Sequence, residues 1–287
     1  MTSHLLARRT AAALLAASLT TSAFSQGASP KPVAKDTIDL QDEKALDAEK
    51  VKLGPAMPSA LPGGAAAPAE VPVQPIPGLD KLSEADRKAV AKGISDVAGF
   101  MRGVRLQESL EKLNEVEKLT GEFHIVANMR GAVFTKMRDF KAARDEFEKA
   151  VALTKGMPRE NFHPRFNLAE INFVEKQWPE ARKSFGELLA SSAIPDAATK
   201  RLMEYKIMIC QLQEKQTDAA MGMIEKFDQY DNESPAFYFG KAAAAFAKDQ
   251  KEEAEEWLGS AAKIYPKEIN DVYQDSLVEV GWLQTLQ

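Results

Sequence analysis

The 287-residue sequence contains a single cysteine, Cys210, and only three histidines. One cysteine allows no disulfide within the chain, so the fold has to be stabilised by its hydrophobic core. We expect Cys210 to be a small buried apolar side chain rather than a reactive thiol. The two histidines beyond the first 25 residues, His124 and His163, have no His or Cys at metal-ligand spacing. The sequence therefore predicts no metal site.

Motifs of catalysis are also missing. The chain has no glycine-rich phosphate loop and no Gly-x-Ser-x-Gly turn, and the carboxylates of "KDQKEEAEEW" fit a solvated helix face. We predict a protein that is not an enzyme and needs no cofactor. Positive charge is scarce as well: 37 basic residues less Arg8 and Arg9, which we expect to be removed with a leader, leave 35 against 42 acidic residues, a net charge of −7. Such a surface repels nucleic acid and anionic lipid.

The N-terminal sequence "MTSHLLARRTAAALLAASLTTSAFSQG" has the order of a secretory signal. Two arginines precede an apolar stretch of about fourteen residues, and small residues follow near a cleavage point at Ser25. A buried N-terminal helix, the alternative, would not explain that order. The stretch falls short of the roughly 20 apolar residues of a stable membrane span. We predict that residues 1–25 are a signal peptide and that the protein is exported, periplasmic or secreted.

Residues 26–78 differ in composition from the remainder of the chain. They hold nine prolines in 53 residues, which predicts a disordered Pro/Ala-rich linker. One island, residues 37–53, could form a short helix, and whether it docks is left open. The globular part is then expected at residues 79–287.

A repeated apolar triplet organises this globular part. In "FKAARDEFEKA", Ala143, Phe147 and Ala150 lie at helical offsets of four and three. The same offsets recur from Ser109, Ala181, Ala220 and Ala254, so that these anchor positions are separated by 34, 38, 39 and 34 residues. The residue that lies twelve positions before each anchor is Gly or Ala in three of the five repeats. A period near 34 predicts stacked helix–turn–helix units. In the fourth unit, Ala219 competes with Ala220 as the anchor.

Across roughly residues 83 to 266 the chain resembles the tetratricopeptide repeat (TPR) family. The segment "ANMRGAVFTKMRDFKAARDEFEKAVAL" is the best copy, and "FYFGKAAAAFAKDQKEEAEEWLGSAAKIYP" also matches up to its closing Pro266. The resemblance implies an all-α fold, a TPR-like α-α superhelix of about five helix pairs. A helix after Pro266 is expected to cover the open end of the stack, because each unit buries its apolar face only against its neighbour. The proline-containing segments 154–166 and 191–200 are predicted to be lengthened turns between units.

The resemblance also implies that the first helix of each pair lines a concave surface. The residues at the inward offsets predict an apolar peptide-binding groove, for which the candidate residues are Asn128, Phe166, Phe173, Tyr205, Phe239 and Phe246. The alternative is that these residues are ordinary core. If these residues form a groove, they favour the function of a non-catalytic exported scaffold that binds a peptide or helix of another envelope or secreted protein. Two alternative functions remain open: an accessory subunit of an envelope peptide- or glycan-processing enzyme, and a self-associating structural protein. The chain could also form a homo-oligomer.

Overall fold

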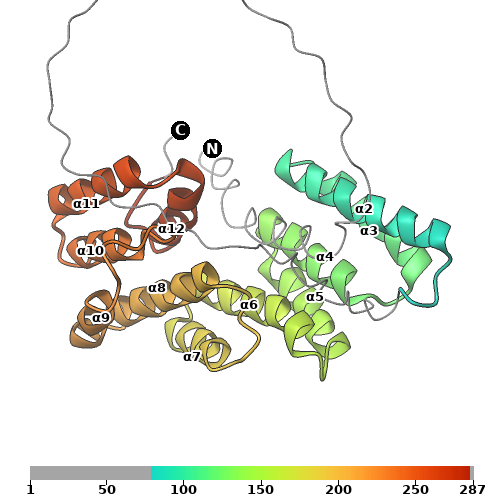
Figure 1. Cartoon of the computed structure of the whole chain (residues 1–287), viewed down its shortest axis with the longest axis horizontal. Coiled ribbons are helices and arrows are strands. Elements are labelled where there is room, and N and C mark those ends of the chain that lie inside the picture. Colours follow the sequence, from blue (N-terminus) through green and yellow to red (C-terminus); the bar gives the residue numbers. More distant parts are fainter. Residues whose placement is uncertain (1–78, 285–287) are drawn as a thin grey trace, which may run out of the picture. The chain divides into compact units, whose positions relative to one another are not determined.

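The computed structural model describes residues 79–284, and within them the chain is entirely helical, with eleven helices (Figure 1). This confirms the predicted all-α class. The predictions for the signal peptide (1–25), the linker (26–78) and the island (37–53) lie outside the described residues. Within residues 79–284, no helix combines the length and the apolar character that crossing a bilayer requires.

Ten of the helices form five consecutive pairs, and an eleventh follows them. The first helices of the pairs are α2 (Glu84–Arg102), α4 (His124–Met137), α6 (Pro158–Val174), α8 (Ala197–Gln213) and α10 (Ala236–Phe246). The second helices are α3 (Leu106–Thr120), α5 (Phe140–Leu153), α7 (Trp178–Leu189), α9 (Thr217–Ile224) and α11 (Lys251–Ile264), and α12 (Lys267–Glu279) comes last. The two helices of each pair pack together, and each pair packs on the next, as the predicted repeat requires.

The predicted anchors account for this packing. All five anchor residues are buried, including Ala220, whereas Ala219 is exposed. The register of the fourth unit is therefore the one that starts at Ala220. The small residue of the best copy, Gly131, lies where a Cβ atom would come within 2.6 Å of the Phe147 ring. The close approach of α4 to α5 thus depends on the absence of a side chain at this position.

The turn inside each pair repeats with the same period as the anchors. The residue five before each anchor adopts a left-handed backbone, with φ between 59° and 63°: Val104, Arg138, Lys176, Lys215 and Asp249. The next residue donates its N–H to a carbonyl five residues earlier, for example Asp139 to Phe134 at 3.0 Å. This six-to-one hydrogen bond is the Schellman arrangement that ends a helix. The repeat therefore extends from the apolar pattern to the backbone conformation.

The proline-containing segment 154–166 is mostly helix, which corrects the prediction of a lengthened turn. Helix α6 begins at Pro158, where a missing N–H costs little, and continues through Pro164. Segment 191–200 does contain a turn, but α8 already begins at Ala197. The extra residues of these two units mainly lengthen α6 and α8, which have 17 residues each.

Candidate interaction site on the first helices

The six residues predicted to line a groove are all buried. Asn128, Phe166, Phe173, Tyr205, Phe239 and Phe246 are each at most 8% exposed. None of them belongs to an open surface of the described chain, which corrects the prediction of an exposed groove and agrees with the alternative of core residues. Peptide binding by the first helices stays a prediction.

Asn128 contacts the neighbouring repeat, and Phe166 packs within its own helix pair. The side chain of Asn167 donates a hydrogen bond to Oδ1 of Asn128 at 2.9 Å, which joins α4 to α6. The Phe166 ring packs on Phe162, with ring centroids 6.1 Å apart, and against the edge of Phe185 at 5.8 Å. These residues belong to the ordinary core of the stacked pairs.

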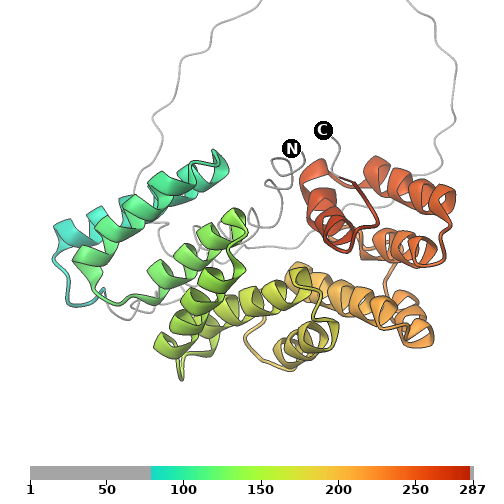
Figure 2. The ribbon, with the colours of Figure 1, turned by 180° about the vertical axis from the view of Figure 1, so that it is seen from behind.

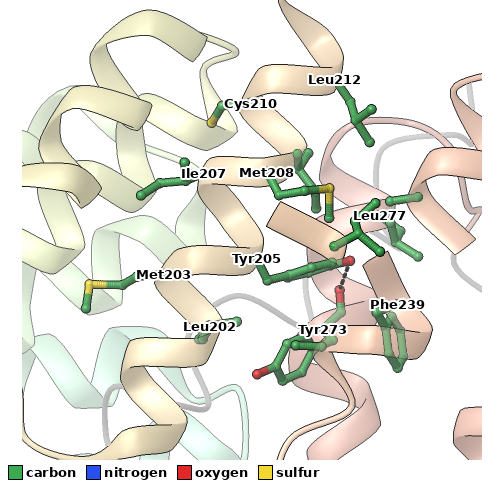
Figure 3. Packing of buried hydrophobic residues seen from close by; sticks show 14 of the residues in the cluster. Leu202, Met203, Tyr205, Ile207, Met208, Cys210, Leu212, Phe239, Tyr273 and Leu277 are labelled. Atoms are coloured by element: carbon green, nitrogen blue, oxygen red, sulfur yellow. Dashed lines mark hydrogen bonds between the residues drawn. The ribbon is translucent and has the colours of Figure 1, made fainter. Parts of the chain in front are cut away.

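Tyr205, Phe239 and Phe246 are instead covered by the C-terminal segment. The Tyr273 ring of α12 packs against both Tyr205 and Phe239, at centroid distances of 4.9 Å and 5.6 Å. Trp282, just beyond α12, stacks on Phe246 with centroids 6.3 Å apart. Figure 3 shows Tyr273 and Leu277 of α12 among the buried side chains of α8 and α10.

Hydrogen bonds add to this apolar contact. The Tyr205 hydroxyl donates to the backbone carbonyl of Tyr273 at 3.2 Å, the bond that is dashed in Figure 3. The hydroxyls of Tyr273 and Ser234 share a hydrogen bond of 2.8 Å. The sequence predicts that the helix after Pro266 covers the end of the stack. Helix α12 does contact the last pair, α10 and α11 (Figure 2), and it also contacts α8 through the backbone carbonyl of Tyr273 and the side chain of Ser276.

An adjoining edge of α12 meets charged side chains of the first helices. The Lys206 ammonium of α8 is only 6% exposed and forms an ion pair with Glu170 of α6 at 3.0 Å. It also donates to Oγ of Ser276 at 3.1 Å and lies 4.6 Å from the centre of the Phe173 ring. One buried lysine thus joins α6, α8 and α12.

The charged edge extends to the end of α4. Arg138 forms an ion pair with Glu279 at 3.0 Å, across 141 residues of sequence. Lys136 of α4 is half-buried, and burial lowers its pKa, although the nearby Asp275 carboxylate acts in the opposite direction. We call the surface that α12 and Trp282 cover the first-helix face. It comprises Lys136, Arg138, Glu170, Tyr205, Lys206, Phe239 and Phe246.

Two carboxyls at this contact are costly to ionise. Burial raises the pKa of Asp275 from 3.8 to about 7, with the negative charges of Asp271, Glu279 and Glu170 adding to the rise and Lys206 opposing it. Burial also raises the pKa of Glu170, against the opposing effect of Lys206. One oxygen of Glu170, Oε1, is buried without a hydrogen-bond partner among residues 79–284. The contact between α12 and the first-helix face therefore carries an electrostatic cost.

The sequence holds signals for part of this site. Lys206 interrupts the apolar run of "LMEYKIMICQL", and a lone lysine in a buried helix needs an acidic partner. Glu170 lies at an inward offset of the repeat. No pattern in the sequence connects either residue to Ser276 or Asp275, because helical periodicity is silent about contacts between distant helices.

Other candidate chemical groups of the chain are separated from one another. Burial raises the pKa of the Cys210 thiol to about 12, which suits the predicted apolar role. Burial lowers the pKa of both His124 and His163, which lie on different helices. No group of three or more His, Cys, Asp or Glu side chains among residues 79–284 is placed to hold a metal ion. A surface pocket next to α6 contains Lys155 and Arg165 but no carboxylate.

Comparisons with known proteins find little similarity. No protein-family model matches the chain, and no curated protein matches it. One solved structure, described as the crystal structure of YrrB, a TPR protein with an unusual peptide-binding site, is 19% identical. The match covers 68% of this chain and 99% of that chain, with a TM-score of 0.42. A TM-score this low carries no inference about the present chain.

Proposed function

We propose that this protein is an exported, non-catalytic interaction scaffold whose first-helix face binds a helical segment of another envelope or secreted protein. The proposal of export comes from the order of charge, apolar stretch and small residues in positions 1–25. The proposal of binding comes from the repeat of helix pairs, which presents successive first helices side by side.

One observation carries the binding part: the first-helix face already holds a helix. Helix α12 lies on it through ring contacts to Tyr205 and Phe239, a hydrogen bond to Lys206 and an ion pair to Arg138. An apolar helix face seated on a complementary surface is the helix-in-groove mode of peptide recognition. A surface that accepts one helix by side-chain contacts has the chemistry to accept another.

Site-directed photo-crosslinking tests this function. A cysteine in place of Lys136, at the edge of the first-helix face, would be labelled with benzophenone-maleimide and illuminated in an envelope extract of the source cells. Native Cys210 should not react with the maleimide, because its thiol is buried and its pKa is raised to about 12. Lys183→Cys on α7, an exposed residue of a second helix, is the matched control.

We expect a defined crosslinked partner from position 136 and none from position 183. Equal recovery from both positions, or no partner from either, would contradict the scaffold function. A crosslink only to a second copy of this chain would favour the self-associating alternative. Export is checked separately by mass spectrometry of the mature N-terminus, which should begin shortly after Ser25.

A further inference from the structure

Helix α12 depends on its contacts for its structure. It has 13 residues, and Pro266 precedes it in an extended conformation with φ −55° and ψ 149°. Isolated helices shorter than about 12–15 residues are marginal in water. We therefore expect α12 to lose its helical structure when it leaves the first-helix face, and the face would then be open to another helix.

The contacts of α12 are formed by two distinct edges. Tyr273 and Leu277, one turn apart, enter the core between α8 and α10 and are at most 4% exposed. Ser276 and Glu279 lie on an adjoining edge and reach Lys206 and Arg138. The first-helix face thus recognises an aromatic and aliphatic edge next to a hydroxyl and a carboxylate.

The fit of α12 is incomplete. Asp275 lies among charges on three other helices and on α12 itself, and burial raises its pKa despite the attraction of Lys206. The charged groups that face it are Lys136 on α4, Glu170 on α6, Lys206 on α8, and Asp271 and Glu279 on α12. Glu170 in turn leaves Oε1 without a hydrogen bond. A helix with a neutral residue at the position of Asp275 would avoid part of this cost.

We propose that α12 is a displaceable, autoinhibitory occupant of the first-helix face. The partner that replaces it is an amphipathic helix with a tyrosine and a leucine one turn apart and an acidic residue on the adjoining edge. The inference rests on the proposed function, that this face binds a helix of another protein. The basic residues Lys136, Arg138 and Lys206 favour a partner edge of negative charge, and the ring contacts favour an aromatic residue opposite Tyr205 and Phe239.

Competition with the tethered helix tests this inference. A peptide of residues 266–284, labelled with fluorescein at its N-terminus, would be titrated by fluorescence anisotropy against the full chain without its leader. In the Tyr273→Ala chain the resident helix loses its ring contacts and its bond to Ser234, whereas the added peptide keeps the native tyrosine. We expect this variant to bind the peptide roughly tenfold or more tightly than the wild type, because a tethered competitor acts at a high effective concentration.

A second variant avoids a cavity in the core. Ser276→Ala with Glu279→Gln removes the contacts to Lys206 and Arg138 without removing an apolar side chain, and it should also increase peptide affinity. Lys267→Ala is the matched control on α12, since Lys267 is largely exposed and its ion pair within the described part of the chain is with Asp271. The Lys267→Ala chain should bind the peptide with the same affinity as the wild type. A peptide carrying Tyr273→Ala should bind the Tyr273→Ala chain and the double variant at least several-fold more weakly than the native peptide does.

The inference is overturned if the wild type and both opened variants bind the peptide equally, or if folded variants do not bind it. If Tyr273→Ala fails to fold, as judged by circular dichroism, the double variant decides. The crosslinking experiment at position 136 separates the two proposals. A captured partner without peptide binding removes only the autoinhibition, whereas peptide binding without any partner removes the scaffold function and leaves the intramolecular contact.

Discussion

Asp275→Asn should stabilise the protein, and the gain should depend on pH. The folded chain holds the Asp275 pKa at about 7, against 3.8 for a solvated carboxyl. A raised carboxyl pKa means that the folded state binds the proton more tightly than the unfolded state. The wild type is therefore free of the penalty below about pH 4, loses stability as the pH rises to about 7, and stays at the reduced level above that. Asparagine cannot ionise and avoids the loss.

The size of the effect follows from the shift. Each pKa unit corresponds to about 1.4 kcal/mol, so the full penalty is of the order of 4 kcal/mol, as an upper figure. Between pH 5 and pH 8 the advantage of Asp275→Asn over the wild type should grow by about 2–3 kcal/mol. Urea unfolding followed by circular dichroism at both pH values measures this difference.

Asp145→Asn, on α5, is the matched control. Asp145 is exposed, and it is not among the charged groups that shift the pKa of Asp275. The control should stay within about 0.5 kcal/mol of the wild type at both pH values. If Asp275→Asn is no more stable than the wild type at pH 8, or if its gain is the same at both pH values, the electrostatic account of the α12 contact is wrong.

Three further predictions concern the core. Phe173→Ala should lower the free energy of unfolding by about 3–5 kcal/mol in denaturant titrations, because the ring is 1% exposed; a loss below about 1 kcal/mol would contradict its burial. Gly131→Ala should cost about 1–3 kcal/mol by the same assay, since the new methyl meets the Phe147 ring, and an unchanged melt would show that α4 and α5 can separate freely. Cys210 should resist iodoacetamide at pH 8 until urea unfolds the chain, because burial raises its pKa to about 12; rapid labelling of the native protein would refute this.

The sequence by itself predicts the repeat because the information is local. An anchor such as Ala143 packs within its own helix pair, and the offsets of four and three that place Ala143, Phe147 and Ala150 on one face follow from helix geometry alone. The same reasoning places the small residue at Gly131, where α4 and α5 come close. For this reason the helix pairs, their order and the buried anchors could all be predicted without tertiary structure.

The sequence alone cannot decide whether the inward residues of the first helices are open or covered. Tyr205 lies at an inward offset in either case, and the answer depends on Tyr273, which is 68 residues away in the sequence. The ion pair of Arg138 with Glu279 spans 141 residues. Helical periodicity reports which face of a helix is apolar, but it does not report which distant segment packs there. The position of α12, and with it the raised pKa of Asp275, was therefore decided by the tertiary structure.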